Sequence, residues 1–173
     1  MTISLYDLSV GSFQQTVSGM IKVLDKGAQH AQANDLDVND YVGMRVHEDM
    51  LPFLFQLNCI ELHSVGCLQA LREGEMSPPT STTQRNYQEI QDMLVGLQTQ
   101  LAEVDEDQIN SLAGKTIIFK FSGHEIPFTS ENYVQSFALP NLQFHAATAY
   151  DILRAQGVRL GKEDFLGKMR IGV

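Results

Sequence analysis

Four long stretches of this 173-residue chain carry apolar residues at helical spacing, and they constrain the fold more than any other feature. The first runs from about residue 12 to 33 and the second from about 50 to 72. The third covers about residues 83 to 104 and the fourth about 130 to 156. Each must bury its apolar face, because packing stabilises most protein helices more than propensity does. Four such helices with short or medium connections predict an all-α four-helix bundle.

The segment between the third and fourth stretches has a different composition. Residues 115–121 and 126–129 are rich in β-branched and aromatic side chains, and residues 122–125 have the composition of a turn. This pattern predicts a small β-hairpin inserted before the fourth helix. Pro127 cannot donate a backbone hydrogen bond, so we expect the second strand at the edge of its sheet. Pro140 removes a backbone hydrogen bond from the fourth helix and should kink it.

Length and charge limit the function classes. The chain is long enough for one sizeable core, and we expect residues 1–173 to form a single domain. The net charge of −9 and the pI of about 4.9 would repel a phosphate backbone, so we expect no nucleic-acid partner. No apolar run approaches the roughly 18 residues that span a bilayer, so we expect no membrane partner.

Two further features favour the cytoplasm. The N-terminus lacks the ordered basic, apolar and small-residue regions of a signal peptide. Cys59 and Cys67 lie eight residues apart on one expected helix, about 12 Å along its axis, which is too far for a disulfide. Thiols that cannot pair fit a reducing compartment, so we expect a cytoplasmic protein.

A histidine lies on the inward side of each of two expected helices. On a helical projection, His63 lies opposite a polar arc of its helix and shares its side with Gln56 and Cys59. His145 lies on the apolar side of the fourth helix, one turn after Asn141. Inward side chains on separate helices are where a bundle builds a metal or ligand site. These five residues are therefore our candidates for a ligand pocket.

Several short segments form a distinctive ordered set along the chain. They are residues 4–7 (SLYD), 47–52 (HEDMLP), 63 (H), 137–141 (FALPN), 144–145 (FH) with 148–150 (TAY), and 161–162 (GK) with 164–167 (DFLG). This set resembles an uncharacterised bacterial domain-of-unknown-function family, placed in the DinB/YfiT-like superfamily of putative metalloenzymes. The resemblance covers nearly the whole chain.

The resemblance implies a DinB-like four-helix bundle with an up-down-down-up arrangement, often as a homodimer. Many DinB-like relatives hold a divalent metal with three histidines, one from the second helix and two from an HxxxH motif on the fourth. By position His63 and His145 match two of these ligands, and Ala149 replaces the third. Some relatives use the metal for thiol-dependent transfer or hydrolysis of small molecules. The broken triad does not carry that activity over to this chain.

The two histidines allow a metal interpretation and a structural one. As metal ligands they would hold a divalent ion such as zinc or nickel, which normally takes three protein ligands at a catalytic site. The third ligand would have to come from Cys59, Cys67 or His30, since Ala149 cannot supply it. As structural residues they would be hydrogen-bonded in the core, to each other or to the neighbouring amides. Those amides are Gln56 and Asn141.

Three hypotheses for the function follow. The first is a DinB-like protein of unknown activity with an incomplete histidine site. The second is a metal-dependent hydrolase or thiol transferase acting on a small molecule. The third is a small-molecule-binding or stress-linked regulatory protein with an apolar cavity. Whether the chain is an enzyme stays open. Aromatic side chains that would line such a cavity are Phe53, Phe55, Phe137 and Phe144.

Overall fold

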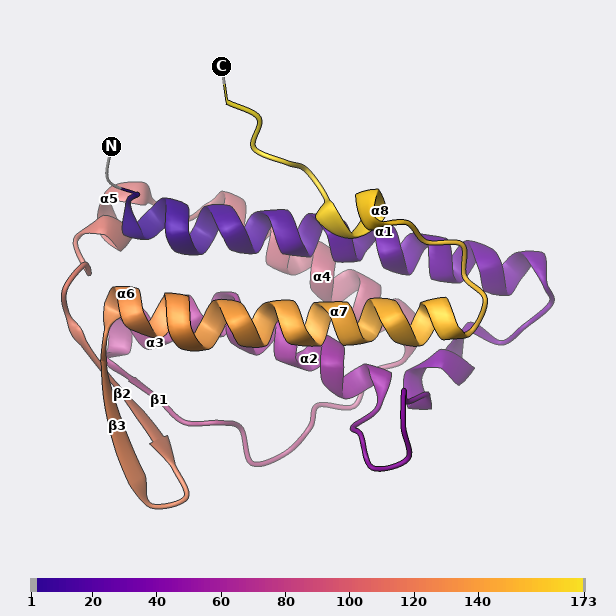
Figure 1. The fold of residues 1–173 in the computed structure, drawn as a ribbon, viewed down its shortest axis with the longest axis horizontal. Coiled ribbons are helices and arrows are strands. Elements are labelled where there is room, and N and C mark those ends of the chain that lie inside the picture. The colour runs from indigo at the N-terminus through magenta and orange to yellow at the C-terminus, as the bar shows by residue number, and fades with distance from the viewer. Residues whose placement is uncertain (1–2, 173) are drawn as a thin grey trace.

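The computed structural model describes residues 3–172, and most of them lie in helices (Figure 1). The longest helices lie side by side along the long axis of the molecule. They are α1 (Ser12–Ala33), α2 (Phe53–His63), α3 (Val65–Glu73), α4 (Tyr87–Ala102) and α7 (Leu139–Ala155). α1 packs against α4 and α7, and α2 packs against α7. Their facing sides contribute to one hydrophobic core. The chain is mostly helical, as predicted.

The bounds of α1 agree with the apolar spacing, and those of α4 are set by a capping motif. Along α1, Phe13, Val17 and Met20 recur at helical spacing and are fully buried. α4 begins four residues later than expected, because Asn86 forms a capping box with Glu89. The Asn86 side chain accepts from the Glu89 backbone N–H, and the Glu89 carboxylate accepts from the Asn86 N–H.

The second long stretch is two helices, which corrects the expected continuous helix over residues 50–72. Ser64, between α2 and α3, leaves the helical region with φ −109° and ψ −89°. Its buried hydroxyl donates to the Ile60 carbonyl one turn back, at 2.6 Å. A serine bonded in this way competes with the backbone hydrogen bonds and bends helices. The break leaves His63 as the last residue of α2.

The fourth stretch changes helix type along its length. α6 (Ser130–Tyr133) leads into a π-helical turn, η3 (Val134–Ala138), and then into α7. Pro140 has no N–H to donate into the preceding turn, and wider π-helical bonding is one way in which a helix accommodates such a gap. The structure thus has a π-helical turn just before Pro140, where the sequence predicts a kink.

A three-stranded sheet lies at one end of the molecule (Figure 1). β2 (Thr116–Phe121) and β3 (His124–Thr129) pair antiparallel, with Ile118 opposite Pro127. β3 is an edge strand, where Pro127 breaks no ladder in the sheet interior. β1 (Glu75–Met76) pairs parallel with β2 and has no signal in the sequence, because two residues are too few for a pattern.

Short elements complete the fold. A π-helical turn, η1 (Asp7–Gly11), precedes α1, and α8 (Lys162–Leu166) packs against α1 near the C-terminus. The other short helices are η2 (Val38–Gly43) and α5 (Glu106–Asn110). Within residues 3–172, none of the helices has the length and apolar character needed to span a bilayer.

Candidate functional site

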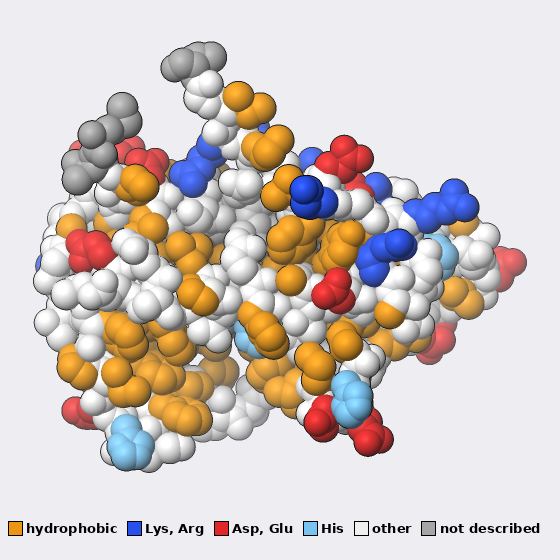
Figure 2. Space-filling view, viewed as in Figure 1, with side chains coloured by type: hydrophobic (Ala, Val, Ile, Leu, Met, Phe, Trp, Pro, Cys, Tyr) orange, Lys and Arg blue, Asp and Glu red, His pale blue; other side chains and the backbone are white. Residues whose placement is uncertain are grey.

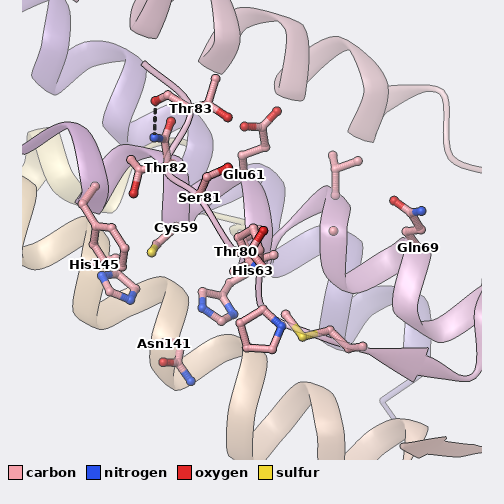
Figure 3. A pocket seen from close by; sticks show the side chains of 18 of the residues that line it. Cys59, Glu61, His63, Gln69, Thr80, Ser81, Thr82, Thr83, Asn141 and His145 are labelled. Atoms are coloured by element: carbon pink, nitrogen blue, oxygen red, sulfur yellow. Dashed lines mark hydrogen bonds between the residues drawn. The ribbon is translucent and has the colours of Figure 1, made fainter. Parts of the chain in front are cut away.

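The two inward histidines meet at a pocket of about 580 Å³ (Figure 3). One wall comes from α2 and α3, and a second from η3 and α7. A third wall is the connection from β1 to α4, and we call its residues 77–85 the strap. Most of the lining is apolar, with hydroxyl groups on the strap side. Lining residues used below are Phe55, Asn58, Cys59, Glu61, His63, Phe137, Asn141 and His145.

All five candidate residues lie at this site, but not in the same role. Cys59, His63, Asn141 and His145 line the pocket. Gln56 is buried behind His145 and fixes its orientation. Figure 3 shows the rings of His63 and His145 beside each other, with Asn141 next to them on α7. The helical projection therefore identified the correct faces of both helices.

His145 is held by a hydrogen bond to Gln56, one of the partners that the sequence suggested. Its Nδ1 lies 2.8 Å from Gln56 Oε1. The Gln56 amide is itself oriented, because its Nε2 donates to the Leu51 carbonyl at 2.8 Å. A flipped amide would set its oxygen against that carbonyl, so Oε1 faces His145 and accepts from Nδ1–H. Nε2 of His145 consequently carries a lone pair.

The ring of His63 finds no hydrogen-bond partner within residues 3–172. Its Nδ1 is buried without one among residues 3–172. The ring lies almost parallel to that of His145, at an angle of 7° with 5.8 Å between centroids. Phe137 meets His63 edge-on at 5.6 Å, and Phe55 meets His145 in the same way at 5.8 Å. A buried polar atom without a partner is uncommon and calls for an explanation.

Both imidazoles are neutral at physiological pH. Burial lowers the pKa of His145 to about 4. Burial, and secondarily the nearby His145, lowers the pKa of His63 to about 4. The site therefore presents two uncharged rings, each with one N–H donor and one lone pair.

The thiol of Cys59 lines the pocket but is not activated. Burial raises its pKa to about 12, so it is protonated at neutral pH. Cys67 is more deeply buried, is not part of the lining, and has a pKa that burial also raises. Neither thiol has the electropositive surroundings that produce a reactive thiolate. Both behave as small core residues.

The described residues do not complete a metal site. Between residues 3 and 172, no three or more His, Cys, Asp or Glu side chains converge as ligands would. Ala149 is fully buried and does not line the pocket. His30 lies elsewhere, near Asn34 and Gly157. The metal interpretation therefore lacks its third ligand.

The strap is the part of the site that the sequence did not reveal. Its composition indicates a loop, yet only the fold shows that this loop closes a pocket. It is fixed to α2 by side chains: Asn58 Nδ2 donates to the Thr83 carbonyl at 2.8 Å, and Arg85 contacts both Asn58 and Glu61. In the described part of the chain, no backbone–backbone hydrogen bond involves residues 77–85.

The aromatic candidates divide between the pocket, the core and the surface. Phe55 and Phe137 line the pocket. Phe53 is fully buried and stacks on Tyr87 at 6.1 Å, so it belongs to the core. Phe144 is 58% exposed and does not line the pocket. In the space-filling view, hydrophobic side chains gather over the sheet and beside a hollow in the same face (Figure 2).

A mostly helical fold with a small sheet and a histidine-lined pocket defines a DinB-like protein, and the comparisons support this class. The crystal structure of a DinB family member protein from Shewanella denitrificans is similar, with a TM-score of 0.80 and 26% identity. The similarity covers 98% of this chain and 95% of that one.

The family follows from a second comparison. The model of the family described as Domain of unknown function (DUF1993) matches residues 5–166, so the chain belongs to this family. A comparison with curated proteins found no match. The chain is thus a DinB-like protein of a family whose function is unknown, as the resemblance implied.

Proposed function

We propose that this protein binds an organic small molecule in the pocket formed by α2, α7 and the strap, and that the two histidines contact this ligand directly. One observation carries the proposal: two neutral imidazoles line a pocket of about 580 Å³, and each has a ring nitrogen without a partner among residues 3–172. This volume lies within the range of small-molecule sites, which combine apolar walls with a few polar groups.

A metal-dependent hydrolase or thiol transferase is less well supported. It needs a third ligand near His63 and His145, and neither Cys67 nor His30 lines the pocket. Cys59 does line it, but among residues 3–172 it does not converge with the two histidines as a set of three ligands. The hydrogen bond between Gln56 and His145 Nδ1 is compatible with small-molecule binding and with metal binding. A metal-bound histidine also uses its second ring nitrogen to hydrogen-bond a neighbouring group.

Further parts of the proposal concern the whole chain. We propose a four-helix bundle with an up-down-down-up arrangement in a single domain spanning residues 1–173. In support, α1 and α7 run in one direction, while α2, α3 and α4 run in the other (Figure 1). We also propose a homodimer in the bacterial cytoplasm, as the family resemblance implies, without nucleic-acid or membrane partners. The net charge of −9 supports the absence of a nucleic-acid partner.

Native mass spectrometry with metal analysis tests the proposed function. Untagged protein is incubated with the low-molecular-weight fraction of a bacterial extract and re-isolated. We expect an organic adduct that His145→Ala loses and that His124→Ala, at the exposed start of β3, retains. Stoichiometric zinc or nickel that His145→Ala removes would overturn the proposal. The absence of any adduct would contradict it as well.

A further inference from the structure

The polar groups of the pocket restrict the chemistry of its ligand. Glu61 is the one charged residue among the lining residues described, and Arg85 already pairs with it at 2.8 Å. An anionic ligand would find no cationic side chain in the lining, and a cationic ligand would find no unpaired carboxylate. Burying an unpaired charge is costly. The ligand that fits is uncharged.

The histidines specify the polar group of that ligand. The Gln56 bond leaves His145 with a bare Nε2, so His145 can accept a hydrogen bond from a donor on the ligand. His63 is 5% exposed, and its neutral ring has one donor and one acceptor. Among residues 3–172, its Nδ1 has neither a partner nor access to solvent, so a ligand would reach His63 through Nε2. A hydroxyl group is both donor and acceptor, so one hydroxyl can serve both rings.

The two rings lie close enough to flank one ligand group, since their centroids are 5.8 Å apart. An oxygen hydrogen-bonded to two nitrogens holds those nitrogens at most about 5.6 Å apart, at about 2.8 Å for each bond. A shared hydroxyl therefore requires nitrogens on the facing sides of the two rings. Phe55 and Phe137 flank the two rings edge-on, so the rest of the ligand would meet apolar walls.

We propose that the pocket takes an uncharged, largely apolar molecule that presents an alcohol or phenol hydroxyl to both His63 and His145. This inference rests on the proposed small-molecule function and adds the chemical class of the ligand. The hydroxyl donates to Nε2 of His145 and accepts from the Nε2–H of His63. It would thus give each Nε2 a partner that residues 3–172 do not supply.

Three matched probes test the inference on the wild-type chain. Phenol is an uncharged donor, anisole has a similar shape without the donor, and benzoate carries a negative charge. Each is titrated into protein with ¹⁵N-labelled histidine, and the imidazole resonances of His63 and His145 are followed by NMR. We expect phenol to bind about tenfold more tightly than anisole or benzoate. One hydrogen bond contributes about 1.4 kcal/mol to the binding free energy, which corresponds to a tenfold change in affinity.

The outcomes separate the two proposals. Equal binding of anisole and phenol would overturn the hydroxyl inference and leave small-molecule binding in place. Benzoate binding as tightly as phenol would overturn the uncharged class. If none of the three probes shifts either ring, the hydroxyl inference is overturned, and the adduct experiment decides the proposed function separately.

Variants add a second arm. His145→Phe should lose phenol binding by about tenfold or more, while His124→Ala, which removes an exposed histidine, should leave it unchanged. Loss of phenol binding in His124→Ala as well would show that the effect is not specific to the pocket and would count against the inference. Because the probe series needs only the wild-type chain, the inference stays testable if His145→Phe does not fold.

Discussion

At the residue scale, Gln56 determines what the site can do. It is 2% exposed, donates to Leu51 on one side and accepts from His145 on the other. Without Gln56, either tautomer of the His145 imidazole could form, depending on which partner was present. Gln56 is a positioning residue: it acts on the ligand through His145.

Replacing Gln56 by Leu should destabilise the protein. The change leaves His145 Nδ1 without its partner in a buried site and removes the bond to the Leu51 carbonyl, which costs about 1–3 kcal/mol in the free energy of unfolding. Urea denaturation of wild type and variant measures it. Gln88→Leu on exposed α4 surface is the matched control, expected to change stability by under about 0.5 kcal/mol. Similar losses in both variants would contradict the role given to Gln56.

The lowered histidine pKa values predict a loss of stability in mild acid. At pH 5 the unfolded chain, with a histidine pKa near 6.5, binds protons that the folded chain does not, since its His63 and His145 have a pKa of about 4. Acid therefore favours unfolding, and the free energy of unfolding decreases as the pH falls from about 6.5 to about 4. The decrease is at most about 3 kcal/mol for each histidine.

Carboxylates also titrate in acid, so the histidine effect is measured as a difference. The double variant His63→Leu/His145→Leu should lose less stability than wild type between pH 7 and pH 4.5, by at least about 2 kcal/mol. Urea denaturation at several pH values checks this. Parallel pH profiles for the two proteins would show that the buried histidines are not neutral in the folded state.

Sequence patterns predicted much of how individual residues are arranged at the site. Helical projection identified the inward sides of His63 and His145 and the place of Gln56 beside them. It could not show that Phe53 and Phe144 lie outside the pocket, because apolar spacing does not separate a core position from a pocket wall. Nor could it assign Gln56 to His145, which depends on how α2 and α7 pack against each other.

At the element scale, the strap is held less firmly than the helices around it. Its side-chain links to α2 run from Asn58 to Thr83 and from Arg85 to Asn58 and Glu61. Segments without backbone hydrogen bonds to the rest of a fold open locally at low free energy. We expect the strap to open first, and Cys59 behind it to become accessible when it does.

Arg85→Met should increase this opening. The variant removes charge-assisted hydrogen bonds, so we expect Cys59 to react about tenfold faster with a thiol reagent such as dithionitrobenzoate. Cys67 should stay unreactive in the folded protein because it is 1% exposed. Arg159→Met, at an exposed arginine, is the control and should react like wild type. An unchanged rate for Arg85→Met, or simultaneous reaction of both thiols, would contradict local opening.

Helix bounds show what sequence reasoning can and cannot predict for elements. The bounds of α1 follow from its apolar stripe alone. The break at Ser64 and the π-helical turn before Pro140 do not, because a serine or proline inside an apolar stripe is compatible with several backbone responses. β1 exists only because β2 lies beside it, which is a tertiary effect.

At the scale of the whole molecule, the C-terminal segment closes the fold against α1. Lys26 Nζ lies 2.7 Å from the Asp164 carboxylate, and this contact, with the Gly161 N–H, lowers the pKa of Asp164. The close approach requires a glycine at position 19, because a Cβ there would lie 2.2 Å from the Phe165 carbonyl oxygen. Residues from both ends of the chain thus stabilise one interface.

Gly19→Ala should therefore destabilise the protein by about 1–3 kcal/mol, since the obstructing atom is backbone. Gly96→Ala is a control with the opposite sign. Gly96 lies inside α4 with open space around it, so alanine there should stabilise by about 0.5–1 kcal/mol. Thermal unfolding of the three proteins gives both values. A neutral Gly19→Ala would contradict the packing of α8 on α1.

The central claim is that His63 and His145 are neutral, metal-free hydrogen-bonding groups that face a pocket. The ¹⁵N chemical shifts of their imidazoles at pH 7, with and without added zinc, test it most directly. The account predicts that His145 carries its proton on Nδ1, that neither ring is protonated, and that one equivalent of zinc shifts neither. A proton on Nε2 of His145, a charged ring at pH 7, or zinc-induced shifts of both rings would contradict it.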